Sequence, residues 1–429
     1  MAKKEEKTAT PRRRFPEFRE GAKWAYIELR QLAKFVTERV GTKYCTPFTV
    51  ISGVGLVSQQ EKHGRTIAGD SLKNYVFLQL NDFAYNKSST KAFPQGFIAR
   101  YTGDDPAAVP NSIFACFRVD DKAVDPSYLD YLFASNLHGK WLRNYISVGA
   151  RAHGSLNVND DDIMALPVPM PTGMTSLNEQ QKIADCLGSL DELIAAQGRK
   201  VEALKVHKRG LMQELFPHEG ETRPRLRFPE FREEAEWENT LLDELARRGS
   251  GHTPNRGNAE YYDGGIKWVS LADSQRLDNG YIAQTATEIS ESGIEHSSAV
   301  LHAADSVILC RDASIGKCAI LRAPMAVSQH FLVWTCDTAL LSNWFLYYYF
   351  QTMRPTFEQV ASGSTIKTIG LPFFKQLKIA KPRLREQHRI ASCLSSLDTL
   401  IDAESEKLVA LKTHKKGLMQ QLFPSPEED

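Results

Sequence analysis

Residues 178–217 read NEQQKIADCLGSLDELIAAQGRKVEALKVHKRGLMQELFP, and residues 385–424 read REQHRIASCLSSLDTLIDAESEKLVALKTHKKGLMQQLFP. About 25 of the 40 aligned positions are identical, at a constant shift of 207 residues. A second segment recurs in the same order, since PRRRFPEFREGAKW (Pro11–Trp24) returns as PRLRFPEFREEAEW (Pro224–Trp237). Repeats on this scale indicate a tandem duplication.

The long repeated segment is predicted to be a helix with a coiled-coil seam, because its apolar residues recur in alternating steps of three and four. Polar residues interrupt the seam at the same two points in both copies, as Gln197 and Lys208 and as Glu404 and Lys415. The apolar seam residues singled out are Ile183, Leu187, Leu190, Ile194, Leu204, Ile390, Leu394, Leu397, Ile401 and Leu411.

The ends of these helices carry local signals. Ser176 followed by Glu179 is predicted to form a capping box, and Pro217 and Pro424 are predicted to end the two helices. A helix of some 38 residues is about 55 Å long, which exceeds what a domain of this size needs. We therefore predict that the two helices pair antiparallel within one chain and give a two-domain dumbbell with pseudo-twofold symmetry. A parallel coiled coil between two chains is the alternative.

The stretches between the repeated segments hardly agree in sequence. We call the repeated segments the frame, and Pro11–Trp24 and Pro224–Trp237 its first and second frame motifs; the stretches between the repeated segments are variable. Runs rich in β-branched and aromatic residues, such as residues 265–273, 306–310 and 318–336, predict strands, and residues 126–142 and 342–353 predict helices. The expected fold class is mixed α/β (α+β). The expected domains are an N-terminal arm with the first frame motif (1–24), a first variable domain (25–175), a central helix (176–217), a linker with the second frame motif (218–237), a second variable domain (238–383), a C-terminal helix (384–424) and a tail (425–429).

Composition places the chain among ordinary folded proteins, with 429 residues, 42% hydrophobic residues and a formal charge of +1. Any nucleic-acid-binding charge must therefore be local. The seven widely spaced cysteines suggest reduced thiols and a cytoplasmic location, and no apolar run is long enough to cross a membrane.

Signatures of catalysis and of metal binding are missing from the sequence. RDASIGKCA (Arg311–Ala319) departs from a phosphate-binding loop at two positions, and the histidines show no metal-ligand spacing. We therefore expect no catalytic residue, no metal and no cofactor on this chain.

Both variable domains instead offer cationic and hydrogen-bonding side chains on segments predicted to be loops, which is the chemistry that contacts phosphates and base edges. The candidates in the first domain are Lys87, Ser88, Lys91, Arg100, Arg151 and His153. Those in the second are Asn255, Arg256, Arg311, Ser314, Lys317, Gln329, Ser364, Thr365 and Lys367. The basic arm Arg12–Arg14 is open to two interpretations, a phosphate contact or a structural or partner-facing role.

Two near-identical frame segments, with EQ-x-x-I-A at the start of the helix and GLMQ-x-LFP at its end, alternate with two variable domains. This pattern resembles the specificity (S) subunits of type I restriction-modification systems, the DNA-methylase S family. Residues Thr253–Asp273 and 314–317 look like the target recognition domains of that family.

The resemblance implies a chain without catalytic activity of its own, in which two target recognition domains each read one half of a bipartite, asymmetric double-stranded DNA site. It implies helices that set the spacer between the halves and dock two modification (methyltransferase) subunits that bind S-adenosylmethionine. It further implies restriction subunits that use ATP and Mg. A related two-component restriction system, a coiled-coil scaffold without DNA specificity and a free-standing enzyme are the alternatives.

Overall fold

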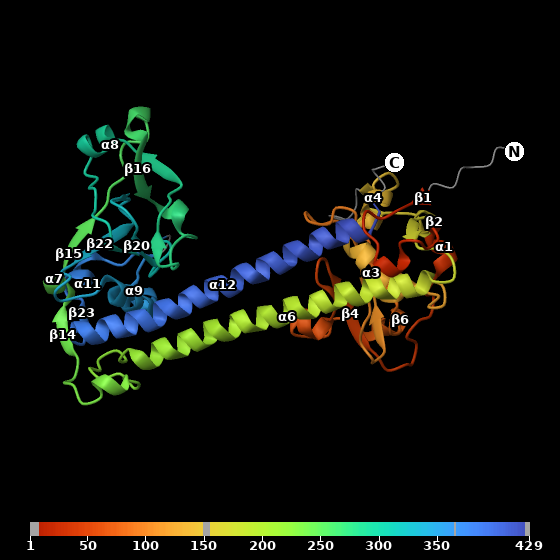
Figure 1. The fold of residues 1–429 in the computed structure, drawn as a ribbon, viewed down its shortest axis with the longest axis horizontal. Helices are drawn as coiled ribbons and strands as arrows, with labels where there is room; N and C mark the ends of the chain where they lie inside the picture. Colours follow the sequence, from red (N-terminus) through yellow and green to blue (C-terminus); the bar gives the residue numbers. More distant parts are fainter. Residues whose placement is uncertain (1–7, 149–154, 364–365, 425–429) are drawn as a thin grey trace. The chain divides into compact units, whose positions relative to one another are not determined.

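The computed structural model describes residues 8–148, 155–363 and 366–424, and the chain folds as two compact units (Figure 1). Unit 1 comprises residues 1–196 and 408–429, and unit 2 comprises residues 197–407. The long helices α6 (Ser176–Leu215) and α12 (Leu384–Leu422) each contribute one part to each unit. They begin at residues 176 and 384.

Unit 1 combines three main sheets with short helices. The sheets have the strand orders β1-β2-β13, β3-β10-β7-β8 and β5-β4-β9-β6, and β11 and β12 form a separate pair. The strands are β1 (Thr8–Ala9), β2 (Trp24–Glu28), β3 (Ala33–Phe35), β4 (Thr46–Ile51), β5 (Gly55–Ser58), β6 (Val76–Leu78), β7 (Phe83–Asn86), β8 (Phe97–Arg100), β9 (Ala107–Val109), β10 (Phe114–Val119), β11 (Ser147–Val148), β12 (Leu156–Asn157) and β13 (Pro167–Met170). The short helices are η1 (Pro16–Phe18), α1 (Leu29–Leu32), α2 (Gln59–His63), η2 (Gly69–Asn74), α3 (Pro126–Ala134), α4 (Leu137–Leu142) and α5 (Asp160–Met164).

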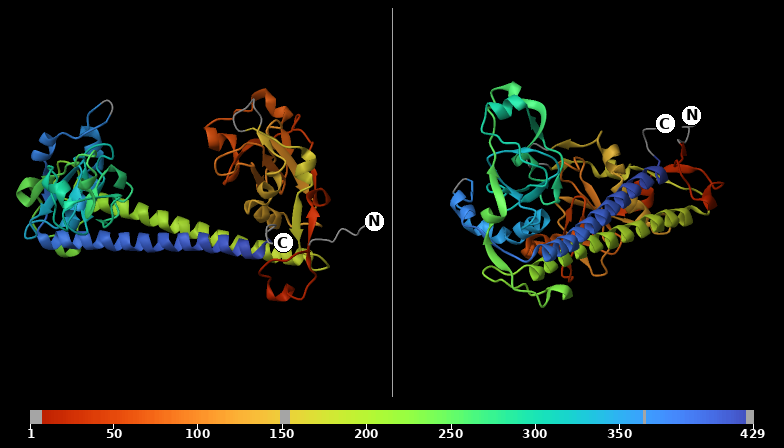
Figure 2. Two further views of the ribbon diagram at one scale, coloured as in Figure 1. Left: turned by 90° about the horizontal axis from the view of Figure 1, so that it is seen from above. Right: turned by 60° about the vertical axis from the view of Figure 1, so that its left-hand side comes forward.

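Unit 2 contains the sheets β15-β22-β19-β20-β17 and β18-β16-β21 and the strand pair β14-β23. Helix α9 packs against β19 and β20. Figure 1 labels α9 and β20, and Figure 2 shows the sheets of this unit, in green to blue, from two further sides. The strands are β14 (Glu238–Leu241), β15 (Ala246–Ser250), β16 (Tyr262–Val269), β17 (Tyr281–Ile282), β18 (Thr287–Ile289), β19 (Val307–Cys310), β20 (Cys318–Leu321), β21 (Ala326–Val327), β22 (Phe331–Cys336) and β23 (Lys378–Lys381). The short helices are η3 (Pro229–Phe231), α7 (Leu242–Leu245), η4 (Ala259–Tyr261), η5 (Leu271–Asp273), α8 (Glu291–Glu295), α9 (Asn343–Thr352), α10 (Arg354–Val360) and α11 (Leu371–Lys375).

The two variable domains share one strand arrangement although their sequences differ. The antiparallel order β3-β10-β7-β8 of unit 1 matches β15-β22-β19-β20 of unit 2. The parallel pair β4-β9 likewise matches the parallel pair β16-β21. The mixed α/β fold class is confirmed, and it holds for both domains.

The predicted seam faces the interior of each unit, since none of its ten apolar residues is exposed. Ile183 and Leu187 join the core of unit 1 together with Leu422, and Ile390 and Leu394 join the core of unit 2 together with Leu215. Burial of such side chains contributes about 1.5–3 kcal/mol each. Within each unit the helix segments run antiparallel in one chain, so the alternative of a parallel pair between two chains is not what the structure has.

The polar interruptions of the seam find partners across it. Lys208 Nζ donates to Asp398 Oδ1 at 2.6 Å in unit 2, and Lys415 Nζ donates to both carboxylate oxygens of Asp191 at 2.6 Å in unit 1. These ion pairs are equivalent under the 207-residue repeat. Gln197 Nε2 donates to Glu404 Oε2 at 2.6 Å, and this pair joins the same position of the two copies.

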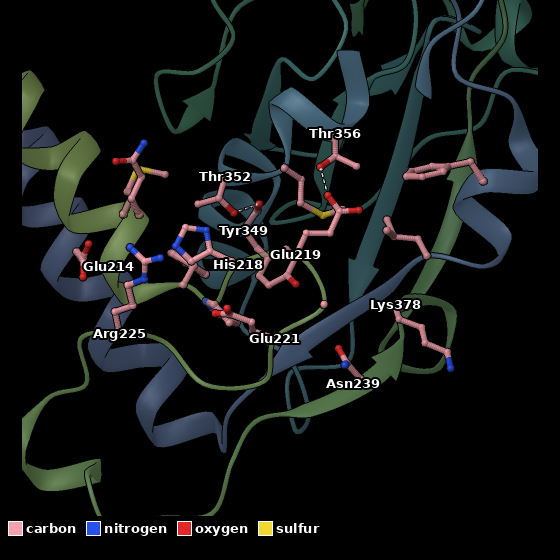
Figure 3. Close-up of a pocket in the computed structure, with 18 of the residues that line it drawn as sticks. Glu214, His218, Glu219, Glu221, Arg225, Asn239, Tyr349, Thr352, Thr356 and Lys378 are labelled. Carbon is pink, nitrogen blue, oxygen red and sulfur yellow. Dashed lines mark hydrogen bonds between the residues drawn. The ribbon is translucent and has the colours of Figure 1, made fainter. Parts of the chain in front are cut away.

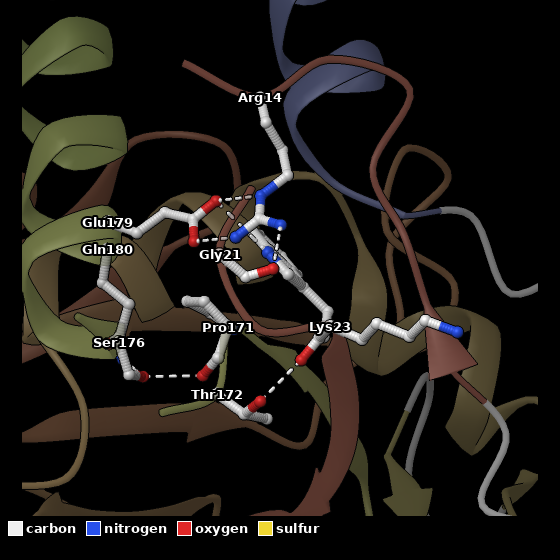
Figure 4. Close-up of polar contacts among 9 residues, drawn as sticks. Arg14, Gly21, Lys23, Pro171, Thr172, Ser176, Glu179 and Gln180 are labelled. Atoms are coloured by element: carbon white, nitrogen blue, oxygen red, sulfur yellow. Dashed lines mark hydrogen bonds and ion pairs between the residues drawn. The ribbon is translucent and has the colours of Figure 1, made fainter. Parts of the chain in front are cut away.

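The first frame motif packs onto the start of α6 through a buried ion pair (Figure 4). Arg14 donates from Nε to Glu179 Oε1 at 2.8 Å and from Nη2 to Oε2 at 2.7 Å, and Trp24 Nε1 donates to the same carboxylate at 3.3 Å. The predicted capping box is therefore wrong, because the Glu179 carboxylate binds Arg14 and Trp24. Ser176 Oγ instead donates to the Pro171 carbonyl at 2.6 Å.

The second frame motif repeats this contact in unit 2. Arg227 donates to Glu386 from Nε at 2.8 Å and from Nη2 at 2.7 Å, and it also donates to the carbonyls of Glu234 and Ala235. The Arg227 and Glu386 side chains are 8% and 1% exposed. Of the two interpretations of the basic arm, the structural one therefore holds for Arg14 and for its counterpart Arg227.

Candidate nucleic-acid interface

The candidate side chains of unit 1 gather around the hairpin that joins β7 to β8. Lys87, Ser88 and Lys91 follow β7 directly, and Lys91 is exposed. Lys87 Nζ pairs with Asp160 Oδ1 at 3.1 Å. Arg151 and His153 lie outside the described residues. The hairpin therefore presents cationic and hydroxyl groups together.

Arg100 differs from the expectation that it lies on a loop. It is the last residue of β8, and its guanidinium is held by Asn81 Oδ1 at 3.0 Å and by Asp130 Oδ2 at 3.4 Å. A DNA contact would have to compete with the Asp130 carboxylate, so Arg100 is the weakest of the described candidates in this unit.

The candidates of unit 2 gather around the hairpin that joins β19 to β20. Arg311, Ser314 and Lys317 lie on this hairpin, and Ser314, Lys317 and Lys367 line one cavity of about 590 Å³. Lys317 Nζ donates to the Ser274 carbonyl at 2.8 Å. Ser364 and Thr365 lie outside the described residues. The cavity is thus lined by three cations (Lys317, Arg354 and Lys367), one carboxylate (Glu358) and the Ser314 hydroxyl.

A second group of unit 2 candidates lies on the segment before η4 and on the β21–β22 turn. Asn255, Arg256 and Gln329 are exposed. The Thr253 hydroxyl donates to Gln329 Oε1, which joins the two segments, and Asn255 Oδ1 accepts from the Gly257 N–H at 3.0 Å. Arg256 is the cation of this group.

The two hairpins are equivalent in their backbone hydrogen bonds. Lys87 N donates to the Ile113 carbonyl at 2.9 Å, and Arg311 N donates to the His330 carbonyl at 2.9 Å. The carbonyl of Lys87 accepts from Leu156 N at 2.9 Å, and that of Arg311 accepts from Ile369 N at 2.9 Å.

Two further features of the hairpins match in the same register. Ser88 bridges to Ser155, and Asp312 bridges to Thr368. Gly96 and Gly316 both adopt a positive φ, of 80° and 78°. Each hairpin thus carries one cation, Lys87 or Arg311, at the same place of the same backbone framework. Residue type alone identified both cations but not their equivalence.

Cys310 lies directly before Arg311 and is fully buried. Burial raises the pKa of the Cys310 thiol to about 11. The sulfur is therefore a protonated thiol near neutral pH, and it donates to the Asp312 carbonyl at 2.9 Å. Its role at the hairpin is structural.

The cavity at the end of α6 in unit 2 has a different character (Figure 3). Its volume is about 670 Å³, and Glu214, Glu219, Glu221 and Arg225 are among its lining residues. Three carboxylates beside few cations disfavour a polyanion such as DNA. Within the part of the chain that the structure describes, no three His, Cys, Asp or Glu residues are grouped so that they could hold a metal ion.

Among the described residues, the structure has no helix of the length and apolarity that would let it cross a membrane. Neither candidate surface lies on a long apolar element, because both consist of hairpins and turns at the ends of strands. Loops at strand ends are positions where binding residues commonly occur on a rigid scaffold.

Residues 234–413 match the model of the family described as the type I restriction modification DNA specificity domain. The chain is 23% identical over 331 residues to the putative type I restriction enzyme MjaX specificity subunit of Methanocaldococcus jannaschii, a match that covers 76% of this chain and 74% of that protein. It is 26% identical over 207 residues to the EcoR124I/EcoR124II specificity subunit of Escherichia coli, covering 45% and 50%.

Two solved structures share the fold. One, from a study of complex assembly and conformational transition of the type I R-M system, has a TM-score of 0.58 at 17% identity and covers 94% of this chain and 98% of its own. The other is the type I restriction-modification S subunit from M. genitalium, with a TM-score of 0.56 at 14% identity, covering 97% and 99%. Residues 234–413 therefore carry the match to a type I restriction modification DNA specificity domain, and the chain is similar to type I restriction enzyme specificity subunits over about three quarters of its length.

Proposed function

We propose that this chain is the DNA-reading subunit of a type I restriction-modification enzyme and has no catalytic activity of its own. Each variable domain reads one half of a bipartite, asymmetric site in double-stranded DNA. The observation that carries this proposal is the pair of equivalent hairpins, which present different side chains on one backbone framework. One framework with two sets of contacts suits two half-sites of different sequence.

The proposed partners are two modification subunits, which would bring S-adenosylmethionine, and restriction subunits, which would bring ATP and Mg. The proposed location is the cytoplasm, where these partners and the DNA meet. The predicted domain limits at residues 25–175 and 238–383 define the two reading modules in this proposal. The long helices set the spacer between the half-sites and dock the modification subunits.

The surface of the long helices supports docking of two like partners. Eight positions on each helix recur in steps of three and four outside the seam, and all eight are identical in the two copies; we call them the shared stripe. Its members are Cys186, Ser189, Leu193, Ala196, Lys200, Ala203, His207 and Gly210, with Cys393, Ser396, Leu400, Ala403, Lys407, Ala410, His414 and Gly417 as their counterparts.

None of these stripe residues is buried, and Leu193 and Leu400 are 47% and 42% exposed. A second stripe runs beside the shared stripe on the same helices, in the same steps of three and four from residue 181 to residue 206. It differs between the two copies at all eight of its positions. Packing within the chain accounts for Lys200, which pairs with Glu404, but it gives no reason for the exposed Leu193 and Leu400 to stay identical. Two copies of one partner, each bound to one helix, would give that reason.

Replacing Leu193 and Leu400 with arginine tests this docking. We expect binding of the modification subunit to weaken by about tenfold or more per site, because each change removes an apolar anchor from an interface. Binding is measured by titration of the full chain with the purified subunit. Glu192→Arg with Thr399→Arg, one residue earlier on the unlike stripe, is the control and should bind normally. Equal loss in both double variants would contradict the docking stripe.

The proposed function itself is tested by coexpression of the chain with its methyltransferase subunit and genome-wide mapping of methylated adenines. A bipartite motif with two unlike halves is the expected result. A complex that forms without producing such a motif would contradict the DNA-reading role, and absence of any complex would favour a scaffold.

Independence of the two modules is tested by replacing residues 25–175 with the first domain of another family member. The exchange should change one half of the methylated motif and leave the other half and the spacer unchanged, because the frame that holds the second module is untouched. Changes in both halves would contradict modular reading.

A further inference from the structure

Each unit contains a hollow at the start of one of two matched strands, β10 or β22. The first hollow, of about 470 Å³, lies between β4 and the start of β10, and Thr49, Ser52, Asn86 and Ile113 are among its lining residues. The second hollow, of about 480 Å³, lies between β16 and the start of β22, and Arg256, Trp268, Ser328 and His330 are among its lining residues. Because β4 corresponds to β16 and β10 to β22, the two hollows lie against matched strands, although only the first is also lined by hairpin residues such as Ser88 and Thr90.

One lining position is equivalent residue by residue. Ile113 and His330 each precede the first residue of a matched strand, Phe114 of β10 or Phe331 of β22. Each also accepts, through its carbonyl, the N–H of the hairpin cation at 2.9 Å. The framework therefore holds both backbones alike, and the two hollows differ there in the side chain.

The side chains at this position have different chemistry. Ile113 is a large apolar residue that is 40% exposed. His330 Nδ1 contacts Asp312 Oδ1 at 2.7 Å, and Asp312 is 7% exposed. A neutral ring that donates Nδ1–H to this carboxylate keeps a lone pair on Nε2. Only a long contact of 3.5 Å, from Gln329 Nε2, reaches that atom among the contacts of the described residues.

One lining residue of each hollow has a buried polar atom without a partner among the described residues. These atoms are Asn86 Oδ1 in the first hollow and Ser328 Oγ in the second. Their residues are 8% and 1% exposed. A buried polar atom that lacks a hydrogen bond is costly unless a ligand supplies one.

The wall of the second hollow is rigid. His252 N donates to the Val327 carbonyl at 3.0 Å, and Trp268 Nε1 donates to the His252 carbonyl at 3.1 Å. A Cβ on Gly251 would lie 1.9 Å from the Val327 carbonyl oxygen, so only glycine lets the segment pass this close. The segment that carries Arg256 is thus fixed against β21 before any ligand binds, which is what discrimination between ligands requires.

We propose that the two hollows are base-reading sites and that Ile113 and His330 are the equivalent residues that make the two half-sites different, an inference that rests on the proposed function. Ile113 contacts the methyl group of thymine in the first half-site. His330, positioned by Asp312, accepts a hydrogen bond from the exocyclic amino group of adenine or cytosine in the second. Both contacts use groups that the major groove displays.

The test maps methylated adenines for the full chain carrying Ile113→Ala or His330→Ala, coexpressed with the methyltransferase subunit. We expect each variant to lower the preference for the correct base by about 5- to 150-fold at one position of the motif. The affected position should lie in one half of the motif for Ile113→Ala and in the other half for His330→Ala. Asp312→Asn should relax the same base position as His330→Ala. A merely structural Asp312 would instead lower methylation at every position alike.

Two matched controls lie outside the hollows. Ile67→Ala replaces an isoleucine that is 55% exposed in unit 1, and His296→Ala replaces an exposed histidine in unit 2, and both should leave the motif unchanged. His330→Gln keeps a polar side chain for the case in which alanine unfolds the domain. A wild-type motif that persists in all hollow variants would overturn this inference. A wild-type complex without a bipartite motif would overturn the proposed function instead.

Discussion

Replacing Glu386 with alanine is expected to lower the free energy of unfolding of unit 2 by about 3–5 kcal/mol, because it leaves the buried Arg227 guanidinium without its counter-charge. The carboxylate receives two N–H groups at 2.8 and 2.7 Å, and both side chains are under 10% exposed. Glu179→Ala should act alike in unit 1, where Arg14 makes the matching contact. Urea unfolding of the full chain measures both.

The exposed pair of Glu230 with Arg389 in unit 2 provides the control. Its side chains are 38% and 48% exposed, so Glu230→Ala should cost less than about 1 kcal/mol. Replacing both buried partners together, as Arg227→Met with Glu386→Leu, should recover much of the loss, since no unpaired charge then remains. A change below 1 kcal/mol for Glu386→Ala would show that this ion pair does not hold the frame motif to α12.

Leu394→Asp is expected to cost several kcal/mol, because it places an unpaired carboxylate in the core of unit 2 at a residue that is 0% exposed. Leu187 is the equivalent residue in unit 1 and is also 0% exposed. Leu190 and Leu397 lie on the same seam but are only partly buried, so a charge there should cost less. Near-UV circular dichroism during urea unfolding measures the loss.

Leu400→Asp on the same helix is the matched control. Its side chain is 42% exposed, so stability should change by less than about 0.5 kcal/mol. The variant should nonetheless impair docking of the modification subunit, since Leu400 belongs to the shared stripe. Equal destabilisation at residues 394 and 400 would contradict the seam.

The long helices could be predicted because the sequence repeats them and because heptad spacing is a local signal. The partners of the polar seam residues could not, since Lys208 and Asp398 are brought together only by the antiparallel register. The capping box failed for a related reason. A local pattern at Ser176 and Glu179 lost to an ion pair with a residue 165 positions away.

In the variable domains, residue type alone does not show which positions of the two domains are equivalent. The sequence predicts Lys87 and Arg311 as cations near turns, but they are 224 positions apart, a shift that matches neither repeat. Loops of different length displace the register, so only backbone hydrogen bonds reveal that the two residues correspond. Ile113 and His330 carry no signal of their own in the sequence. The shared sheet order was likewise hidden, because many different side chains satisfy the same alternation of buried and exposed positions.

The contact between Gln197 and Glu404 bears on how the duplicated chain arose. The two residues occupy the same position of the duplicated helix, so a precursor with a single copy that paired with itself would have placed one residue type opposite itself. Two glutamates there would repel each other, whereas hydrogen bonds from Gln197 and Lys200 hold the pKa of Glu404 below its ordinary value. An unlike pair at a self-facing position cannot form between two identical copies, so it requires two copies of different sequence, which the fused chain supplies. Once both copies lay on one chain, this position could hold glutamine in one copy and glutamate in the other. The unlike pair now stabilises pairing of the two different helices over pairing of either helix with its own copy.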